Sequence, residues 1–91
     1  MSCEGYYQCV CKNKHAYIIS LFDPRLCVER LKIEEIPCDF CKARNIWNNF
    51  VDETNCDSKG YIKLDIYLDE NDFPTVTTKF FEKYINKNSY Y

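Results

Sequence analysis

The cysteines constrain the fold of this chain more than any other feature. Seven of them occur within 91 residues, namely Cys3, Cys9, Cys11, Cys27, Cys38, Cys41 and Cys56. A chain this short buries little apolar surface, so its fold commonly depends on disulfides, a metal ion or a partner. An even cysteine count and a signal peptide are typical of a secreted protein held together by disulfides, and the sequence shows neither. We therefore expect reduced thiols, a metal site and a cytoplasmic location. A mature chain that has lost its signal peptide, with disulfides in place of the metal, is the alternative.

Two short motifs define the expected metal site. In Cys38-Asp39-Phe40-Cys41 two residues separate the cysteines, a spacing that lets both thiolates bind one ion from a single turn. Upstream, three residues separate Cys11 from His15, and a further 22 lead to the second motif, enough for a hairpin that brings the halves together. We predict a closed Zn²⁺ site formed by Cys11, His15, Cys38 and Cys41. Such a site is structural because no coordination position is left for water. Cys9 is an alternative ligand, in place of Cys11 or His15.

The hydrophobic pattern indicates a mixed fold. We expect strands at residues 16–22, 26–36, 44–51 and 61–68, of which the last alternates most clearly, with Ile62, Leu64, Ile66 and Leu68 on one face. The strands at 44–51 and 61–68 are expected to pair as an antiparallel hairpin (44–68) across a polar loop. Apolar residues at helical spacing predict an amphipathic helix at 75–87 that packs on the sheet. The sequence thus predicts one α+β domain over residues 1–91, a small zinc ribbon with knuckles around 9–15 and 38–41.

The two motifs also carry a family resemblance. Residues 11–17 (CKNKHAY) resemble the first knuckle of rubredoxin-like zinc ribbons, and residues 38–43 (CDFCKA) resemble the second. Together with residues 46–62, the stretch 9–68 is similar to small bacteriophage zinc-ribbon proteins of unassigned function. The resemblance implies a structural zinc and a three-stranded ribbon sheet, and no activity. Lys14 and Lys42 stand where the family pattern often has glycine, which predicts strain at a left-handed backbone position after the second cysteine.

Charge is distributed unevenly along the chain. The whole chain has a net charge of −2, and residues 52–72 hold seven acidic and two basic side chains, a net of −5. An acidic surface accelerates association with a basic partner, and tyrosine is enriched at protein interfaces. We therefore expect a non-enzymatic protein-interaction module, and the bacteriophage resemblance suggests a host-directed inhibitor or adaptor acting in anti-defence or host takeover. Its expected contact residues are Tyr61, Asp65, Tyr67, Asp52, Glu53 and Asp57.

Two other functions stay open from the sequence. One is a nucleic-acid-binding zinc ribbon with a role in transcription, using the basic residues around the knuckles, Lys12, Lys14, Lys42 and Arg44. The other, weaker one is a redox protein that uses the thiols of Cys38 and Cys41. No catalytic motif for a hydrolase or a nucleotide-binding enzyme is present, and no apolar run is long enough for a membrane span.

Overall fold

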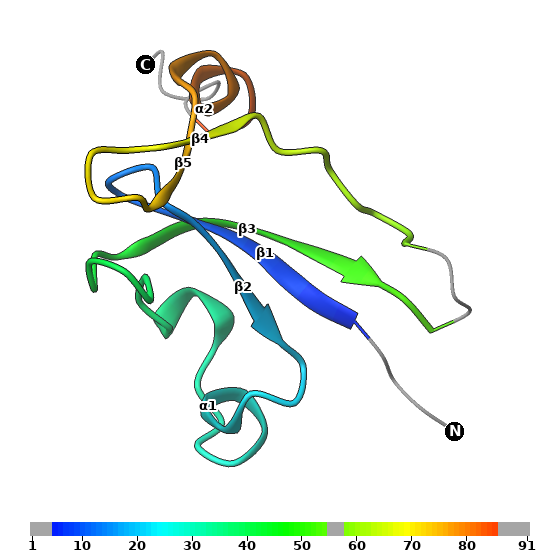
Figure 1. Cartoon of the computed structure of the whole chain (residues 1–91). Helices are drawn as coiled ribbons and strands as arrows, with labels where there is room; N and C mark the ends of the chain where they lie inside the picture. Colours follow the sequence, from blue (N-terminus) through cyan, green and yellow to red (C-terminus); the bar gives the residue numbers. More distant parts are fainter. Residues whose placement is uncertain (1–4, 55–57, 86–91) are drawn as a thin grey trace, which may run out of the picture.

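A three-stranded antiparallel sheet with the strand order β2-β1-β3 organises the chain (Figure 1). The computed structural model describes residues 5–54 and 58–85. Strand β1 (Gly5–Cys11) is central, and it pairs with β2 (Ala16–Ser20) on one side and with β3 (Asn45–Asp52) on the other. Between β2 and β3 the chain forms a short helix α1 (Pro24–Cys27) and a 3₁₀ turn η1 (Ile33–Glu35).

The two faces of this sheet are covered by different segments. One face packs against the turns between β2 and β3, in a cluster of buried side chains formed by Cys9, Cys11, Tyr17, Ile19, Ile36 and Cys38. The other face is covered by the C-terminal part of the chain, which contains β4 (Ile66–Leu68), β5 (Pro74–Val76) and helix α2 (Thr78–Tyr84). There Val10 and Ala16 pack against Val76 and Phe80. Alternation along β1 therefore sends its cysteines to one core and Val10 to the other.

The predicted fold class is confirmed, since the chain is a small α+β structure with antiparallel sheets and a C-terminal helix. The strands expected at 16–22 and 44–51 correspond to β2 and β3. The sequence pattern did not predict β1, because residues 1–15 are polar and rich in cysteine. None of the described helices is long and apolar enough to span a membrane.

The strand predicted at 26–36 is wrong. Asp23 starts a helix there, with its side chain accepting a hydrogen bond from the backbone N–H of Arg25 and with Pro24 in the first helical position. Both features favour helix initiation. Cys27, at the end of this helix, is exposed.

The predicted hairpin between 44–51 and 61–68 is also wrong. The chain does turn back after β3, where Asp52 and Lys59 exchange backbone hydrogen bonds, but the ladder stops there. Strand β3 pairs with β1, and β4 pairs with β5. Residues 61–65 instead form an extended strap over the sheet, where the amide of Gln8 bonds both backbone groups of Ile62. Ile62 and Leu64 pack into the core as predicted, whereas Ile66 and Leu68 are exposed.

The helix is shorter than the predicted 75–87. Residues 74–76 form β5, and Thr77 caps α2 by accepting a hydrogen bond from the N–H of Phe80. An extended Pro74 and a capping threonine together move the helix start to Thr78. Residues 86 and 87 lie outside the described part of the chain.

Candidate metal centre

The first half of the site is the tight turn between β1 and β2. Cys11 ends β1 and His15 directly precedes β2, and the N–H of Cys11 donates to the carbonyl of His15. The N–H of Lys14 closes the turn on the carbonyl of Cys11, with Lys14 in the left-handed region at φ 71°. This backbone aims the thiol and the imidazole at the same point.

The second half is the turn that leads into β3. The N–H of Cys38 donates to the carbonyl of Ala43, and the N–H of Lys42 donates to the carbonyl of Cys38. Lys42 has φ 63°, so it occupies the left-handed position predicted after the second cysteine. The turn places Cys38 in the core, and Cys41 is half-buried.

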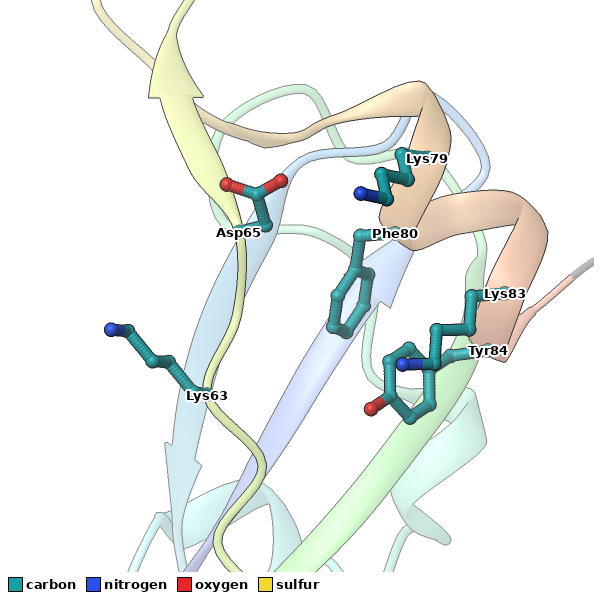
Figure 2. A pocket seen from close by; sticks show the side chains of 6 residues that line it. All are labelled: Lys63, Asp65, Lys79, Phe80, Lys83 and Tyr84. Carbon is teal, nitrogen blue, oxygen red and sulfur yellow. The ribbon is translucent and has the colours of Figure 1, made fainter.

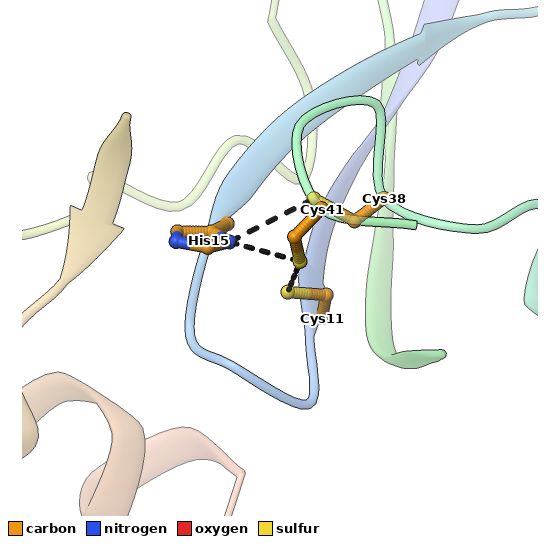
Figure 3. A group of neighbouring side chains, drawn as sticks. All are labelled: Cys11, His15, Cys38 and Cys41. Carbon is orange, nitrogen blue, oxygen red and sulfur yellow. Dashed lines mark hydrogen bonds between the residues drawn. The ribbon is translucent and has the colours of Figure 1, made fainter. Parts of the chain in front are cut away.

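Folding brings these four side chains together (Figure 3). Their donor atoms all lie within 4.8 Å of one another. The Nδ1 atom of His15 lies 3.1 Å from the sulfur of Cys41 and 4.0 Å from that of Cys38, and the sulfurs of Cys11 and Cys41 are 3.7 Å apart. The group could therefore hold one metal ion.

The distances fit a tetrahedral ion. For zinc, bonds of about 2.3 Å to sulfur and about 2.0 Å to nitrogen imply sulfur–sulfur separations of about 3.8 Å and sulfur–nitrogen separations of about 3.5 Å. The sulfur–sulfur distance of 3.7 Å agrees with this, and the sulfur–nitrogen distances of 3.1 and 4.0 Å lie on either side of it. A disulfide would need about 2.05 Å between sulfurs, and the five cysteines in the described part of the chain are free thiols.

Several groups around the donors support negative charge on sulfur. The backbone N–H of Asn13 donates to Cys11 over 3.3 Å, and its side-chain amide lies 3.5 Å from the sulfur of Cys41. The N–H of Phe40 donates to the sulfur of Cys38 over 3.3 Å. N–H donors of this kind stabilise thiolates and orient them toward a cation.

The histidine is oriented by a carboxylate. The Nε2 atom of His15 lies 3.1 Å from a carboxylate oxygen of Asp69, which follows β4. In the tautomer that leaves Nδ1 free for a metal, Nε2 carries the proton and donates it to Asp69. The backbone N–H groups of Phe73 and Asn71, together with His15, hold the pKa of Asp69 below its ordinary value. Sequence reasoning missed Asp69, and its place in the acidic block gave no sign of a role at the metal centre.

The thiols of the site differ in acidity. Burial raises the pKa of Cys11 to about 12, against the opposing effect of hydrogen bonds. Burial also disfavours ionisation of Cys41, but hydrogen bonds from Asn13, Ala43 and His15 outweigh it and lower its pKa to about 6. Without a metal, Cys41 is thus the more readily ionised of these two donors.

Cys9, the alternative ligand, lies outside the cluster. Its side chain is fully buried in the core, and its thiol donates a long hydrogen bond to the carbonyl of Tyr7 over 3.9 Å. Burial raises its pKa to about 12. Cys9 and Cys11 share one face of β1, but only Cys11, at the end of the strand, reaches the turn.

The structure spreads the expected partner-binding residues from the end of β3, where Tyr61 closely follows the bridge between Asp52 and Lys59, along the strap to β4. Tyr61 and Tyr67 are each 52% exposed, and Asp65 between them is exposed as well. Asp52 and Glu53 lie at the far end of β3, away from β4 (Figure 1), and both are half-buried. Asp57 lies outside the described residues.

Two of the basic residues near the knuckles, Lys12 and Arg44, lie next to each other. The N–H of Lys12 donates to the carbonyl of Arg44 over 2.8 Å, which places the two residues side by side. Lys12, Lys42 and Arg44 are exposed. Lys14 turns away toward α2, where its ammonium group bonds Thr78 and lies over the ring of Phe81.

Comparisons with protein-family models, with curated proteins and with solved structures find no match to this chain. The geometry of the site therefore carries the functional argument.

Proposed function

We propose that the protein is a small zinc-binding module whose Cys3His centre is structural and whose function is to bind another protein. The observation that carries the metal assignment is the group of four donor atoms, three thiols and one imidazole nitrogen, that all lie within 4.8 Å of one another. Three thiolates and one imidazole are typical of structural zinc. All four coordination positions are filled by the chain, which supports a non-enzymatic role.

The contact between His15 and Asp69 supports a link from the metal to the proposed binding surface. Asp69 immediately follows β4, which carries the exposed Tyr67, and Asp65 immediately precedes that strand. A zinc ion on His15 would hold this segment in place through Asp69. We infer that the region around Tyr61, Asp65 and Tyr67 contacts a basic surface on the partner.

The identity of the partner is the finer part of the proposal. The resemblance of residues 9–68 to bacteriophage zinc ribbons supports a host protein as the target and the host cytoplasm as the location. In this proposal the chain acts as an inhibitor or adaptor in anti-defence or host takeover. Nucleic-acid binding in transcription is the alternative, and the side-by-side placement of Lys12 and Arg44 favours it.

Native mass spectrometry of protein purified without added metal tests the zinc centre. We expect one zinc per chain, lost on acidification, with every cysteine reduced in the denatured sample. Cobalt substitution then checks the ligand set, because a tetrahedral Cys3His site gives intense visible absorption. A metal-free chain with a mass deficit of two hydrogens per bridge would replace the zinc centre with disulfides, or with a redox pair if Cys38 and Cys41 are bridged.

Affinity capture from nuclease-treated bacterial lysate tests the binding role. We expect a defined protein to be captured by the wild-type chain and lost with the double substitution Tyr61→Ala and Tyr67→Ala. The matched control is Phe22→Ala, which removes an aromatic ring that is 66% exposed on another part of the surface. Equal capture by all three chains would reject this surface, and a partner captured from untreated lysate but not from nuclease-treated lysate would favour the nucleic-acid alternative.

A further inference from the structure

A cleft with basic residues on its rim lies between the strap and helix α2, apart from the metal centre (Figure 2). Its volume is about 180 Å³, and it is lined by Lys63, Asp65, Lys79, Phe80, Lys83 and Tyr84. Figure 2 shows Lys79 and Lys83 extending from the helix toward the strap, next to the rings of Phe80 and Tyr84. Lys63 lies across from them on the strap.

The charges around the cleft are unbalanced. Within residues 5–54 and 58–85, no ion pair involves Lys63, Lys79 or Lys83. The carboxylate of Asp65 accepts a hydrogen bond from the hydroxyl of Thr77 over 2.9 Å and offsets only one of the positive charges at the cleft. The ammonium groups of Lys79 and Lys83 repel one another at this cleft, whereas the side chain of Lys63 extends away from it (Figure 2), and a bound anion relieves that repulsion.

Aromatic rings form the floor beside these lysines. The rings of Phe80 and Tyr84 lie 4.5 Å apart between centroids, and the ammonium group of Lys83 lies 5.3 Å from the centroid of Tyr84. Phe80 is buried and rests edge-on against Trp47 on the sheet, with 5.9 Å between centroids. The half-buried ring of Tyr84 is therefore held against the core by Phe80, with the ammonium group of Lys83 over it.

We propose that this cleft binds the phosphate group of a nucleotide, with the attached base or sugar against Tyr84. Lysine binds phosphate as a compact point charge, whereas recognition of planar carboxylates favours the fork of arginine, which the cleft lacks. Positive charge beside an aromatic ring is the combination used for single-stranded nucleic acids. The volume is below the roughly 300 Å³ typical of sites for whole small molecules, so the cleft accommodates the phosphate group and leaves the rest of the nucleotide at its rim.

Titration of the zinc-loaded, ¹⁵N-labelled chain followed by NMR tests this proposal. The probes are inorganic phosphate, thymidine monophosphate, an oligothymidylate of eight nucleotides and phosphotyrosine. We expect both thymidine ligands to shift the amides of residues 63–65 and 79–84 and the indole of Trp47, and to bind more tightly than inorganic phosphate. If the oligothymidylate binds more tightly than thymidine monophosphate, the ligand is a single-stranded nucleic acid. If the two affinities are equal, the ligand is a free nucleotide.

Two double variants separate this cleft from the knuckle lysines. Lys79→Gln with Lys83→Gln should weaken thymidine monophosphate binding by about tenfold or more, because charge-assisted hydrogen bonds are lost. The control, Lys12→Gln with Arg44→Gln, removes the same amount of charge at the knuckles and should leave the affinity for thymidine monophosphate unchanged. Zinc content and amide dispersion check that each variant is folded.

Four outcomes would overturn the proposal. They are shifts confined to the knuckles, inorganic phosphate binding as tightly as the nucleotide, tighter binding of phosphotyrosine, and no binding by the folded chain.

Discussion

The Nε2 atom of His15 lies 3.1 Å from the carboxylate of Asp69, although 54 positions separate the two residues in sequence. The other ring nitrogen of His15 faces the three sulfurs. One imidazole thus joins the β1–β2 turn to the turn between β4 and β5. The backbone supports the same junction, because the N–H of Val76 donates to the carbonyl of Lys14 over 2.8 Å.

Removing this carboxylate should weaken metal binding without removing a ligand. We expect Asp69→Ala to lower the affinity for zinc by about 10- to 100-fold, because outer partners of ligating histidines orient the ring and raise its basicity. Competition with a chromophoric chelator measures the change. The neighbouring Glu70→Gln is the matched control, since Glu70 is exposed and makes no hydrogen bond or ion pair in the described part of the chain. Equal affinities of Asp69→Ala and the wild type would remove Asp69 from the site.

Cys9 and Cys11 lie on the same face of β1, and substituting each one should show that Cys11 is a metal ligand and Cys9 a core residue. We expect Cys11→Ala to lose tetrahedral cobalt absorption and to unfold, because a structural zinc supplies folding free energy. Cys38→Ser should behave in the same way. Cys9→Ala should keep one zinc per chain and lose only about 1 kcal/mol of stability, for a small buried side chain. Loss of metal in Cys9→Ala, or a Cys38→Ser chain that melts like the wild type, would contradict this ligand set.

The four cysteine and histidine positions could be predicted to meet because each pair is fixed by a short turn. Cys11 and His15, and likewise Cys38 and Cys41, are brought together by local backbone that needs no knowledge of the rest of the fold. The α+β class followed from alternation and helical spacing in the same way. Such local signals survive whatever the tertiary arrangement.

The wrong hairpin and the missed Asp69 involve contacts between distant segments. The alternation of residues 61–68 is compatible with a strand in a hairpin or with an extended strap. The strap forms because the side chain of Gln8, 54 positions away in sequence, bonds the backbone of Ile62. A buried glutamine in a polar N-terminal stretch gave no sign of such a partner. The role of Asp69 could not be predicted for the same reason, because its hydrogen bond with His15 depends on where His15 lies in the folded chain.

Lys14 and Lys42 have left-handed backbone conformations, and substitution by glycine tests how much stability the protein loses through this strain. Lys42 has φ 63° and an exposed side chain, so we expect Lys42→Gly to stabilise the zinc-loaded protein by up to about 1 kcal/mol. Lys14→Gly should gain less, because it also loses the contacts of Lys14 with Thr78 and Phe81. Lys12→Gly is the control: Lys12 has no positive φ, so the added chain entropy should destabilise it by about 0.5–1 kcal/mol. Urea unfolding at saturating zinc gives all three values, and a Lys42→Gly chain less stable than the wild type would refute the argument.

The buried amide of Gln8 should control the strap that leads to β4. Its side chain is 2% exposed, donates to the carbonyl of Ile62 over 2.7 Å, and accepts from the N–H of Ile62 and the amide of Asn49. Gln8→Met keeps the size of the side chain but removes these bonds, so we expect a loss of about 2 kcal/mol. Native-state hydrogen exchange localises the effect. The amide of Ile62 should exchange much faster in the variant, whereas that of Val10 should change only by the loss in global stability. If both amides accelerate by the same factor, Gln8 stabilises the whole sheet and does not specifically hold the strap.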